Sequence, residues 1–183
     1  MPWFDSKANL SVFFKMLAPG PEERILDVGA GRGTLADLVR SEGNSEVYAA
    51  DPDGSRIESI RRTYPSLKGC VANSENLPYP DSYFDKVYST LALHHFPDQR
   101  RSLQEFARVL KPNGLLLIVE IQPHSSQGMF LRFFENGIMR SHLKFLQMDS
   151  LAEMLREEGG FETKAMTAGS FVYFVGSMKG NQV

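Results

Sequence analysis

The stretch ILDVGAGRGTL, residues 25–35, joins an apolar run to a loop that carries three glycines at alternate positions, Gly29, Gly31 and Gly33. An apolar run of this length predicts a buried β-strand, and the residues that follow predict a helix. With so few side chains, the loop can bring bare backbone against the polar part of a ligand. A tight strand-to-helix turn without a ligand is the alternative interpretation.

The acid at position 27 indicates what kind of ligand this loop takes. Dinucleotide sites use the pattern G-x-G-x-x-G, whose third glycine would fall at Thr34 when counted from Gly29. Asp27 would also place negative charge beside a pyrophosphate, which needs donors and positive dipoles. The acid instead favours a cationic ligand. S-adenosylmethionine fits, because it carries an ammonium group and a sulfonium and has no phosphate.

Outward from this stretch, strand and helix patterns alternate along the chain. We expect strands at residues 24–28, 46–51, 67–71, 85–90 and 115–120, and helices at 5–17, 34–43, 54–64, 99–110 and after 149. The Lys111–Gly114 segment predicts a turn before the fifth strand. Two β-rich runs joined through Ala168-Gly169 predict a final antiparallel pair.

This order predicts an α/β fold, doubly wound around a mostly parallel sheet with helices on both faces. One domain spans residues 1–183. Its expected parts are an N-terminal helical segment (1–17), a ligand-binding core (24–120), a cap-like insertion (121–148) and a final helix with a β-hairpin (149–183).

Composition sets the broad class of protein. The formal charge of −2 gives no sign of a nucleic-acid partner, and the single cysteine, Cys70, excludes an internal disulfide and a multi-thiolate metal site. We find no apolar stretch long enough for a membrane span and no secretory signal at the start, so the expected location is the cytoplasm.

Five blocks of sequence, in order, carry a resemblance to a known family: ILDVGAGRG, AADPD, ANSENLPYPDSYFD, STLALHHF and RVLKPNGLLLIVE. Together they resemble the class I S-adenosylmethionine-dependent methyltransferases, and most closely the small-molecule branch that contains the quinone-biosynthesis C-methyltransferases. The resemblance covers about residues 24–120. It implies a Rossmann-like, seven-stranded sheet whose last strand is antiparallel, and S-adenosylmethionine as cofactor with S-adenosylhomocysteine as product.

The resemblance also assigns the cofactor contacts position by position. The methionine part would lie against Gly29, Ala30, Gly31 and Thr90, the ribose against Asp51, and the adenine against Pro52, Asn73 and Ser74. An acid at the end of the second strand suits ribose hydroxyls, although that feature alone does not separate S-adenosylmethionine from NAD. Two residues depart from the family pattern. Asn73 stands where many relatives have an acid, and Asn113 replaces a glycine but tolerates a positive φ.

Two adjacent histidines, His94 and His95, are the candidate catalytic residues. They follow the fourth strand, where the acceptor should enter, and a general base is needed only if the acceptor loses a proton. A packing or hydrogen-bonding role is the alternative for both. A metal site that combines them with His124 is disfavoured, because adjacent histidines on an extended chain point to opposite sides. We expect no metal.

The insertion and the N-terminal segment are rich in Phe, Leu and Met, which predicts a small hydrophobic acceptor and a lid that becomes ordered when cofactor and acceptor are both present. Phe130, Phe134 and Ile138 repeat every four residues, as do Arg132, Asn136, Arg140 and Lys144. Ordinary packing is the alternative, and the aromatics Trp3, Phe4, Phe13 and Phe14 are further candidates for closing the mouth.

Two other functions stay open: a non-catalytic S-adenosylmethionine-binding subunit or sensor, and a nicotinamide-dependent oxidoreductase. Oligomeric state stays open as well.

Overall fold

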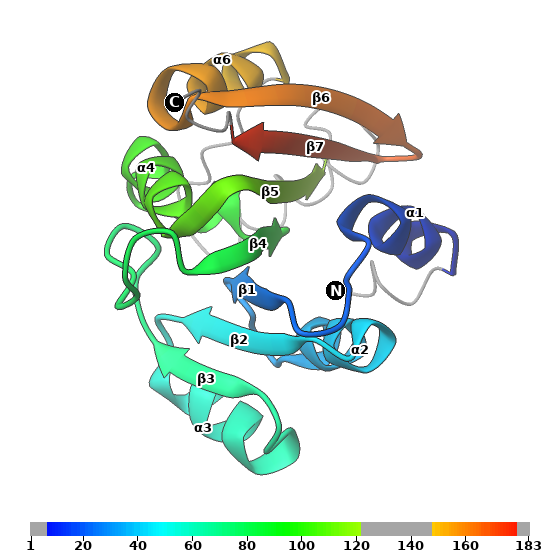
Figure 1. The fold of residues 1–183 in the computed structure, drawn as a ribbon, viewed down its shortest axis with the longest axis vertical. Helices are drawn as coiled ribbons and strands as arrows, with labels where there is room; N and C mark the ends of the chain where they lie inside the picture. Colours follow the sequence, from blue (N-terminus) through cyan, green and yellow to red (C-terminus); the bar gives the residue numbers. More distant parts are fainter. Residues whose placement is uncertain (1–6, 122–147, 179–183) are drawn as a thin grey trace, which may run out of the picture.

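The structure is a computed structural model that describes residues 7–121 and 148–178 (Figure 1). Most of the expected insertion, with its aromatic and basic repeats and His124, lies outside the described residues. So do Trp3 and Phe4. The expectations for these residues therefore remain predictions.

A seven-stranded sheet forms the centre of the molecule, in the order β3-β2-β1-β4-β5-β7-β6 (Figure 1). Its strands are β1 (Arg24–Val28), β2 (Glu46–Asp51), β3 (Lys68–Val71), β4 (Phe84–Thr90), β5 (Leu110–Ile121), β6 (Phe161–Ala168) and β7 (Phe171–Met178). The first five pair in parallel, and β7 lies antiparallel to both β5 and β6. The expected doubly wound sheet with its antiparallel final strand is confirmed.

The helices cover both faces of this sheet. They are α1 (Lys7–Leu17), α2 (Thr34–Gly43), α3 (Gly54–Thr63), the short 3-10 helix η2 (Leu93–His95), α4 (Gln99–Val109) and α6 (Met148–Gly159). Buried side chains of α1, α2 and α3 share one core cluster, and those of α4 and α6 share the other. The two clusters lie on opposite faces of the sheet, as the predicted βαβ order requires.

Strand β5 begins earlier than the sequence indicated. Leu110 already pairs with Phe84, and the register then shifts before Lys86 pairs with Leu115. The expected turn is therefore a bulge inside the strand. Asn113 has a φ of 64° there, which agrees with the expected tolerance for a positive φ.

Phe13 does not close the mouth of a site. Its side chain is fully buried, and its ring packs edge-on against Tyr88 of β4 with centroids 5.3 Å apart. The helical period of α1 places this residue on the face that packs on the sheet. Phe14 is partly buried against the same core cluster.

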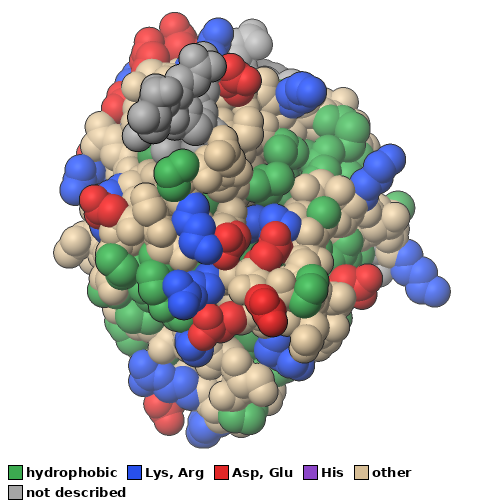
Figure 2. Space-filling view, in the orientation of Figure 1, with side chains coloured by type: hydrophobic (Ala, Val, Ile, Leu, Met, Phe, Trp, Pro, Cys, Tyr) green, Lys and Arg blue, Asp and Glu red, His purple; other side chains and the backbone are tan. Residues whose placement is uncertain are grey.

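Charged side chains are mixed over the face shown in Figure 2, where blue and red groups alternate. In the described residues, ion pairs also join separate segments of the chain, such as Lys111 with Asp85 at 2.7 Å and Arg108 with Asp81 at 2.8 Å. This face offers no broad field of one sign, which agrees with the small net charge.

Candidate functional site

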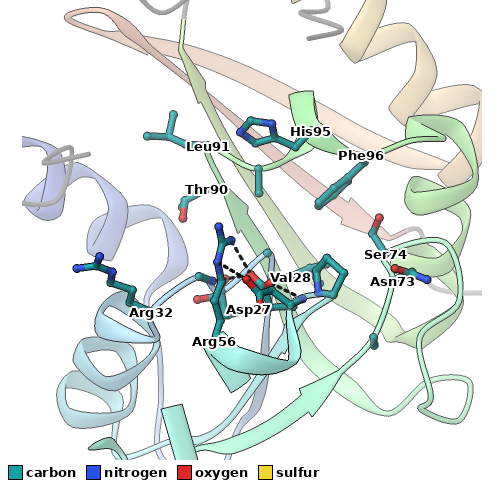
Figure 3. A pocket seen from close by; sticks show the side chains of 18 of the residues that line it. Asp27, Val28, Arg32, Arg56, Asn73, Ser74, Thr90, Leu91, His95 and Phe96 are labelled. Carbon is teal, nitrogen blue, oxygen red and sulfur yellow. Dashed lines mark hydrogen bonds and ion pairs between the residues drawn. The ribbon is translucent and has the colours of Figure 1, made fainter. Parts of the chain in front are cut away.

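A cavity of about 770 Å³ opens at the carboxyl ends of β1, β2 and β4. Parallel sheets bind ligands at this edge, where the strand order reverses between β1 and β4. Four stretches of chain line it: all of residues 72–75, and most of residues 27–35, 51–56 and 90–97. Figure 3 shows Leu91, His95 and Phe96 on one side of the space and Asp27 and Arg56 on the other.

Asp27 is a buried acid that faces this cavity with one oxygen unpaired. Its side chain is 2% exposed, and its Oδ2 accepts a hydrogen bond of 3.0 Å from the Tyr88 hydroxyl. Oδ1 has no partner among the described residues. Burial raises the pKa of Asp27 to about 7, the Tyr88 hydrogen bond opposes this rise, and the charge of Asp51 adds to it. A donor or a cation in the cavity would satisfy the unpaired oxygen.

Asp51 holds the glycine loop in place. Its Oδ2 accepts from the Gly31 amide at 2.9 Å, and its Oδ1 accepts from the Asp53 amide at 3.0 Å. Arg56 approaches the same carboxylate, with Nη1 3.4 Å from Oδ2. The predicted ribose-binding acid therefore also connects the loop after β1 to the start of α3.

The three glycines of the loop adopt left-handed backbone conformations. Gly29, Gly31 and Gly33 have φ values of 80°, 57° and 77°. The amides of Gly29 and Ala30 both donate to the carbonyl of Ala50, at 2.8 and 3.1 Å. The loop is thus tied to the end of β2 and turns its open side to the cavity.

The far side of the cavity is formed by the loop after β3. Ser74 is buried and its Oγ accepts from the Ser102 hydroxyl at 2.9 Å, whereas Asn73 is exposed. Pro52 is exposed at the end of β2, and Thr90 is half-buried at the end of β4. Every cofactor contact that the resemblance assigned lines this one cavity.

The two histidines separate into different environments. His94 is 5% exposed and does not line the cavity; its Nδ1 lies 2.7 Å from Glu120 Oε2. The other oxygen of Glu120 accepts from the Leu93 amide at 2.9 Å. His94 therefore anchors η2 to the end of β5, which agrees with the hydrogen-bonding role given above as the alternative to a catalytic base. His95 is exposed and lines the cavity.

Four residues of the site were missed from the sequence. Arg32, Arg56 and Leu91 line the cavity, and the buried Tyr88 contacts it only through Asp27. Tyr88 occupies the position two before Thr90, so strand alternation puts both on one face, but only the register with β1 reveals its contact with Asp27. Arg32 lies inside the glycine loop and Arg56 in the first turn of α3. The sequence showed these positions, but not which way their side chains point.

The described residues contain neither a candidate metal site nor a candidate membrane span. Within residues 7–121 and 148–178, no group of three or more His, Cys, Asp or Glu is placed to hold a metal ion. In the same part of the chain, no helix combines the length and apolar content that crossing a membrane requires.

Known proteins resemble this chain in both sequence and fold. The sequence model of the methyltransferase domain family matches residues 26–118. A demethylmenaquinone methyltransferase of Thermotoga maritima is 28% identical, over 85% of this chain and 77% of its own length. A probable S-adenosylmethionine-dependent methyltransferase of Mycobacterium tuberculosis is 32% identical over 81% of this chain.

This chain spans 53% of that Mycobacterium protein, about half the length, as it does for other curated relatives. Among solved structures, an S-adenosylmethionine-dependent methyltransferase of Mesorhizobium loti superposes with a TM-score of 0.81 at 18% identity. That superposition covers 94% of this chain and 99% of the other. At 18% identity, this similarity shows that the two proteins share a fold and nothing more.

Proposed function

This chain belongs to the methyltransferase domain family, and on that premise we propose that it transfers a methyl group to a small, hydrophobic acceptor. Members of the family are enzymes that use S-adenosylmethionine as cofactor, so the cofactor follows from membership. The acceptor, the residues that contact the cofactor and the residues that act in catalysis are the proposed part.

One observation carries the assignment of the cavity to this cofactor. Asp27 leaves a buried carboxylate oxygen unpaired at the cavity wall, and an unpaired buried acid is costly unless a donor or cation meets it. The α-ammonium group of S-adenosylmethionine is such a cation. Bound S-adenosylmethionine supplies an activated methyl group on a sulfonium, so the protein need not activate the donor.

We assign the remaining contacts along the cavity wall. The backbone of Gly29–Gly31 and the Thr90 side chain would hold the methionine part, and Asp51 would accept from the ribose hydroxyls. The adenine would lie between Pro52 and the loop that carries Asn73 and Ser74. The support is that all of these residues line one cavity of a size suited to such a ligand.

The chain's own contribution to the reaction would be mainly geometric. Methyl transfer needs the acceptor nucleophile in line with the methyl carbon and shielded from water. His95 is the titratable side chain we propose for accepting a proton where the acceptor must lose one. Its exposed ring has room to meet an acceptor at the rim.

Two observations support a hydrophobic acceptor. Apolar side chains line part of the cavity, namely Leu91, Ala92, Phe96 and Pro97. The Thermotoga relative carries the name of a menaquinone-precursor methyltransferase, and a quinone precursor is a lipophilic substrate. A pocket lined by such groups binds apolar ligands more tightly than polar ones.

Thermal-shift measurements and a transfer assay test the proposal. A ligand at 100 times its dissociation constant stabilises a protein by about 2.7 kcal/mol, so S-adenosylmethionine and S-adenosylhomocysteine should raise Tm while NAD should not. Stabilisation by NAD alone would identify a nicotinamide enzyme and contradict the proposal.

The transfer assay uses S-adenosylmethionine with a labelled methyl group and two acceptor sets. We expect label in lipophilic hydroquinones and none in hydrophilic catechols, peptides or nucleic acids. Turnover of polar acceptors alone would refute the hydrophobic acceptor, and cofactor binding without turnover of any acceptor would favour a sensor or a non-catalytic subunit.

A further inference from the structure

The hydroxyl of Tyr88, on the strand next to β1, forms a hydrogen bond with Asp27, the buried acid at the cavity. Asp27 of β1 and Tyr88 of β4 are paired in register, so their side chains lie on the same face of the sheet. The Tyr88 hydroxyl donates to Asp27 Oδ2 at 3.0 Å, which leaves Oδ1 as the oxygen without a partner among the described residues. The hydrogen bond therefore decides which oxygen is available to a ligand.

Tyr88 itself is held rigidly. Its side chain is fully buried, and its ring meets the ring of Phe13 from α1 edge-on at 79°. A buried aromatic ring in such a packing arrangement has little freedom to turn its hydroxyl elsewhere. The direction of the hydrogen bond is thus set by the packing of α1 on the sheet.

Charged groups line the cavity around Asp27 from all four of its segments, including Asp53 after β2 and Glu75 in the loop after β3. Asp51 approaches from the end of β2, and Arg56 of α3 is paired with Asp51 rather than with Asp27. Arg32 lines the cavity from the glycine loop, and His95 lines it from η2. Burial raises the pKa of Asp27 to about 7, and the Tyr88 hydrogen bond is the contact that lowers it. Without that hydrogen bond, burial and the charge of Asp51 would both raise the pKa of Asp27, and no contact would lower it.

We propose that Tyr88 is a positioning residue for the cofactor, which favours the ionised form of Asp27 and directs its free oxygen toward the cofactor's ammonium group. This inference rests on the proposed cofactor contact of Asp27. Tyr88 acts only through Asp27, because the hydroxyl is directed at that carboxylate and the ring is packed in the core.

Tyr88→Phe should weaken cofactor binding in a pH-dependent way. Loss of one hydrogen bond to the charged form should raise the pKa of Asp27 by about one unit. At pH 7 the ionised fraction then falls, and S-adenosylmethionine should bind about fivefold more weakly. The ratio of the variant and wild-type dissociation constants should approach one as pH rises well above both pKa values.

The experiment is isothermal titration of S-adenosylmethionine into wild type and Tyr88→Phe between pH 6 and 9. The ammonium group of the ligand titrates equally in both arms, so it cancels in the ratio. Tyr48→Phe is the matched control. It removes a hydroxyl hydrogen bond of 2.8 Å to Tyr83, outside the cavity, and should leave the ratio at one at every pH.

A second pair of variants separates positioning from loss of folding. In an Asp27→Asn background, adding Tyr88→Phe should change cofactor affinity far less than it does in wild type, because the two residues act as a unit. An unchanged pH profile in Tyr88→Phe, or equal losses in both backgrounds, would overturn the inference. A wild type that does not bind S-adenosylmethionine would instead refute the proposed function.

Discussion

At the scale of single residues, the conformation of the glycine loop depends on one close approach. A Cβ placed on Gly29 would lie 2.4 Å from the Cβ of Ala92, at the start of the segment that carries both histidines. A Cβ on Gly31 would meet nothing within 4 Å. Both glycines have positive φ, so a side chain at either position would bring backbone strain. Only a side chain at Gly29 would also clash with Ala92.

Gly29→Ala and Gly31→Ala therefore form a matched pair. Placing alanine at a positive φ costs about 1–2 kcal/mol, and this should be the whole loss of unfolding free energy for Gly31→Ala. Gly29→Ala should lose at least about 2 kcal/mol more, because backbone and Ala92 must move apart. Urea unfolding of both variants without ligand measures the difference. Equal losses would show that the approach of Ala92 imposes no constraint.

The sequence located most polar residues of the site but not how their atoms are used. Asp51 was placed correctly at the end of a strand, yet both of its oxygens already accept backbone amides, which no spacing rule reveals. His94 and His95 are adjacent in sequence and serve different surroundings. Such differences arise from strand register and side-chain direction, which a single sequence does not contain.

At the scale of elements, helix α4 fixes the loop that forms the far wall of the cavity. Glu105 is 3% exposed and accepts from the Leu77 amide at 2.9 Å and from Arg108 Nη2 at 2.7 Å. Arg108 donates to the carbonyls of Tyr79 and Leu77 at 2.8 and 3.0 Å. The hydrogen bond from Arg108 lowers the pKa of Glu105 despite its burial.

Glu105→Ala should release this loop. Loss of the carboxylate leaves the Leu77 amide without its buried acceptor, which costs about 1–3 kcal/mol. The freed loop should also weaken cofactor binding, because it carries Asn73 and Ser74. Because the pKa of Glu105 is lowered, its contribution to stability is full above the ordinary value of 4.5 and is lost as pH falls through the lowered value. The stability difference between wild type and variant should therefore shrink in acid.

The control is Glu157→Ala, which removes an exposed partner of Arg100 at 3.4 Å and should cost less than about 1 kcal/mol. Denaturant unfolding at pH 7 and pH 3, together with cofactor titration, distinguishes the two. A Glu105→Ala protein with wild-type stability and affinity would show that the loop is held by its other contacts.

The sequence predicted the ends of helices and strands well where a glycine or polar residue marks them. It predicted them poorly where tertiary pairing or packing sets the boundary. Helix α2 ends at Gly43, as expected. Strand β5 runs through Lys111–Gly114 because pairing with Phe84 extends the sheet past a local turn signal. Phe13 was a candidate for the mouth because its segment is aromatic, but tertiary packing turned it to the core.

At the scale of the whole molecule, the sheet order brings four distant segments to one edge. Strands β1 and β4 are neighbours in the sheet, although 55 residues (29–83) separate Val28 from Phe84, and the cavity lies at their carboxyl ends. The alternation of strands and helices predicted a doubly wound sheet, and family resemblance supplied the position of the last strand. The β6–β7 hairpin lies at the other end of the sheet from β3 (Figure 1).

This arrangement predicts a pattern of hydrogen exchange on cofactor binding. A ligand that binds only the native state suppresses local opening wherever it makes contacts. S-adenosylmethionine should therefore slow exchange together in residues 27–33, 51–56, 72–75 and 90–97, which share the cavity and are far apart in sequence. Exposed edge strand β6 should exchange at the same rate with and without the ligand, apart from any global stabilisation.

The measurement is hydrogen exchange followed by mass spectrometry, with S-adenosylhomocysteine as a second ligand and Asp27→Asn as the control protein. Since both ligands carry the same ammonium group, both should protect residues 27–33 in wild type, and protection there should weaken in Asp27→Asn. Protection of residues 27–33 alone, without the loop after β3, would place the adenine outside the proposed wall. Protection confined to the β6–β7 hairpin would mean that the ligand binds elsewhere and that the cavity at the carboxyl ends has another use.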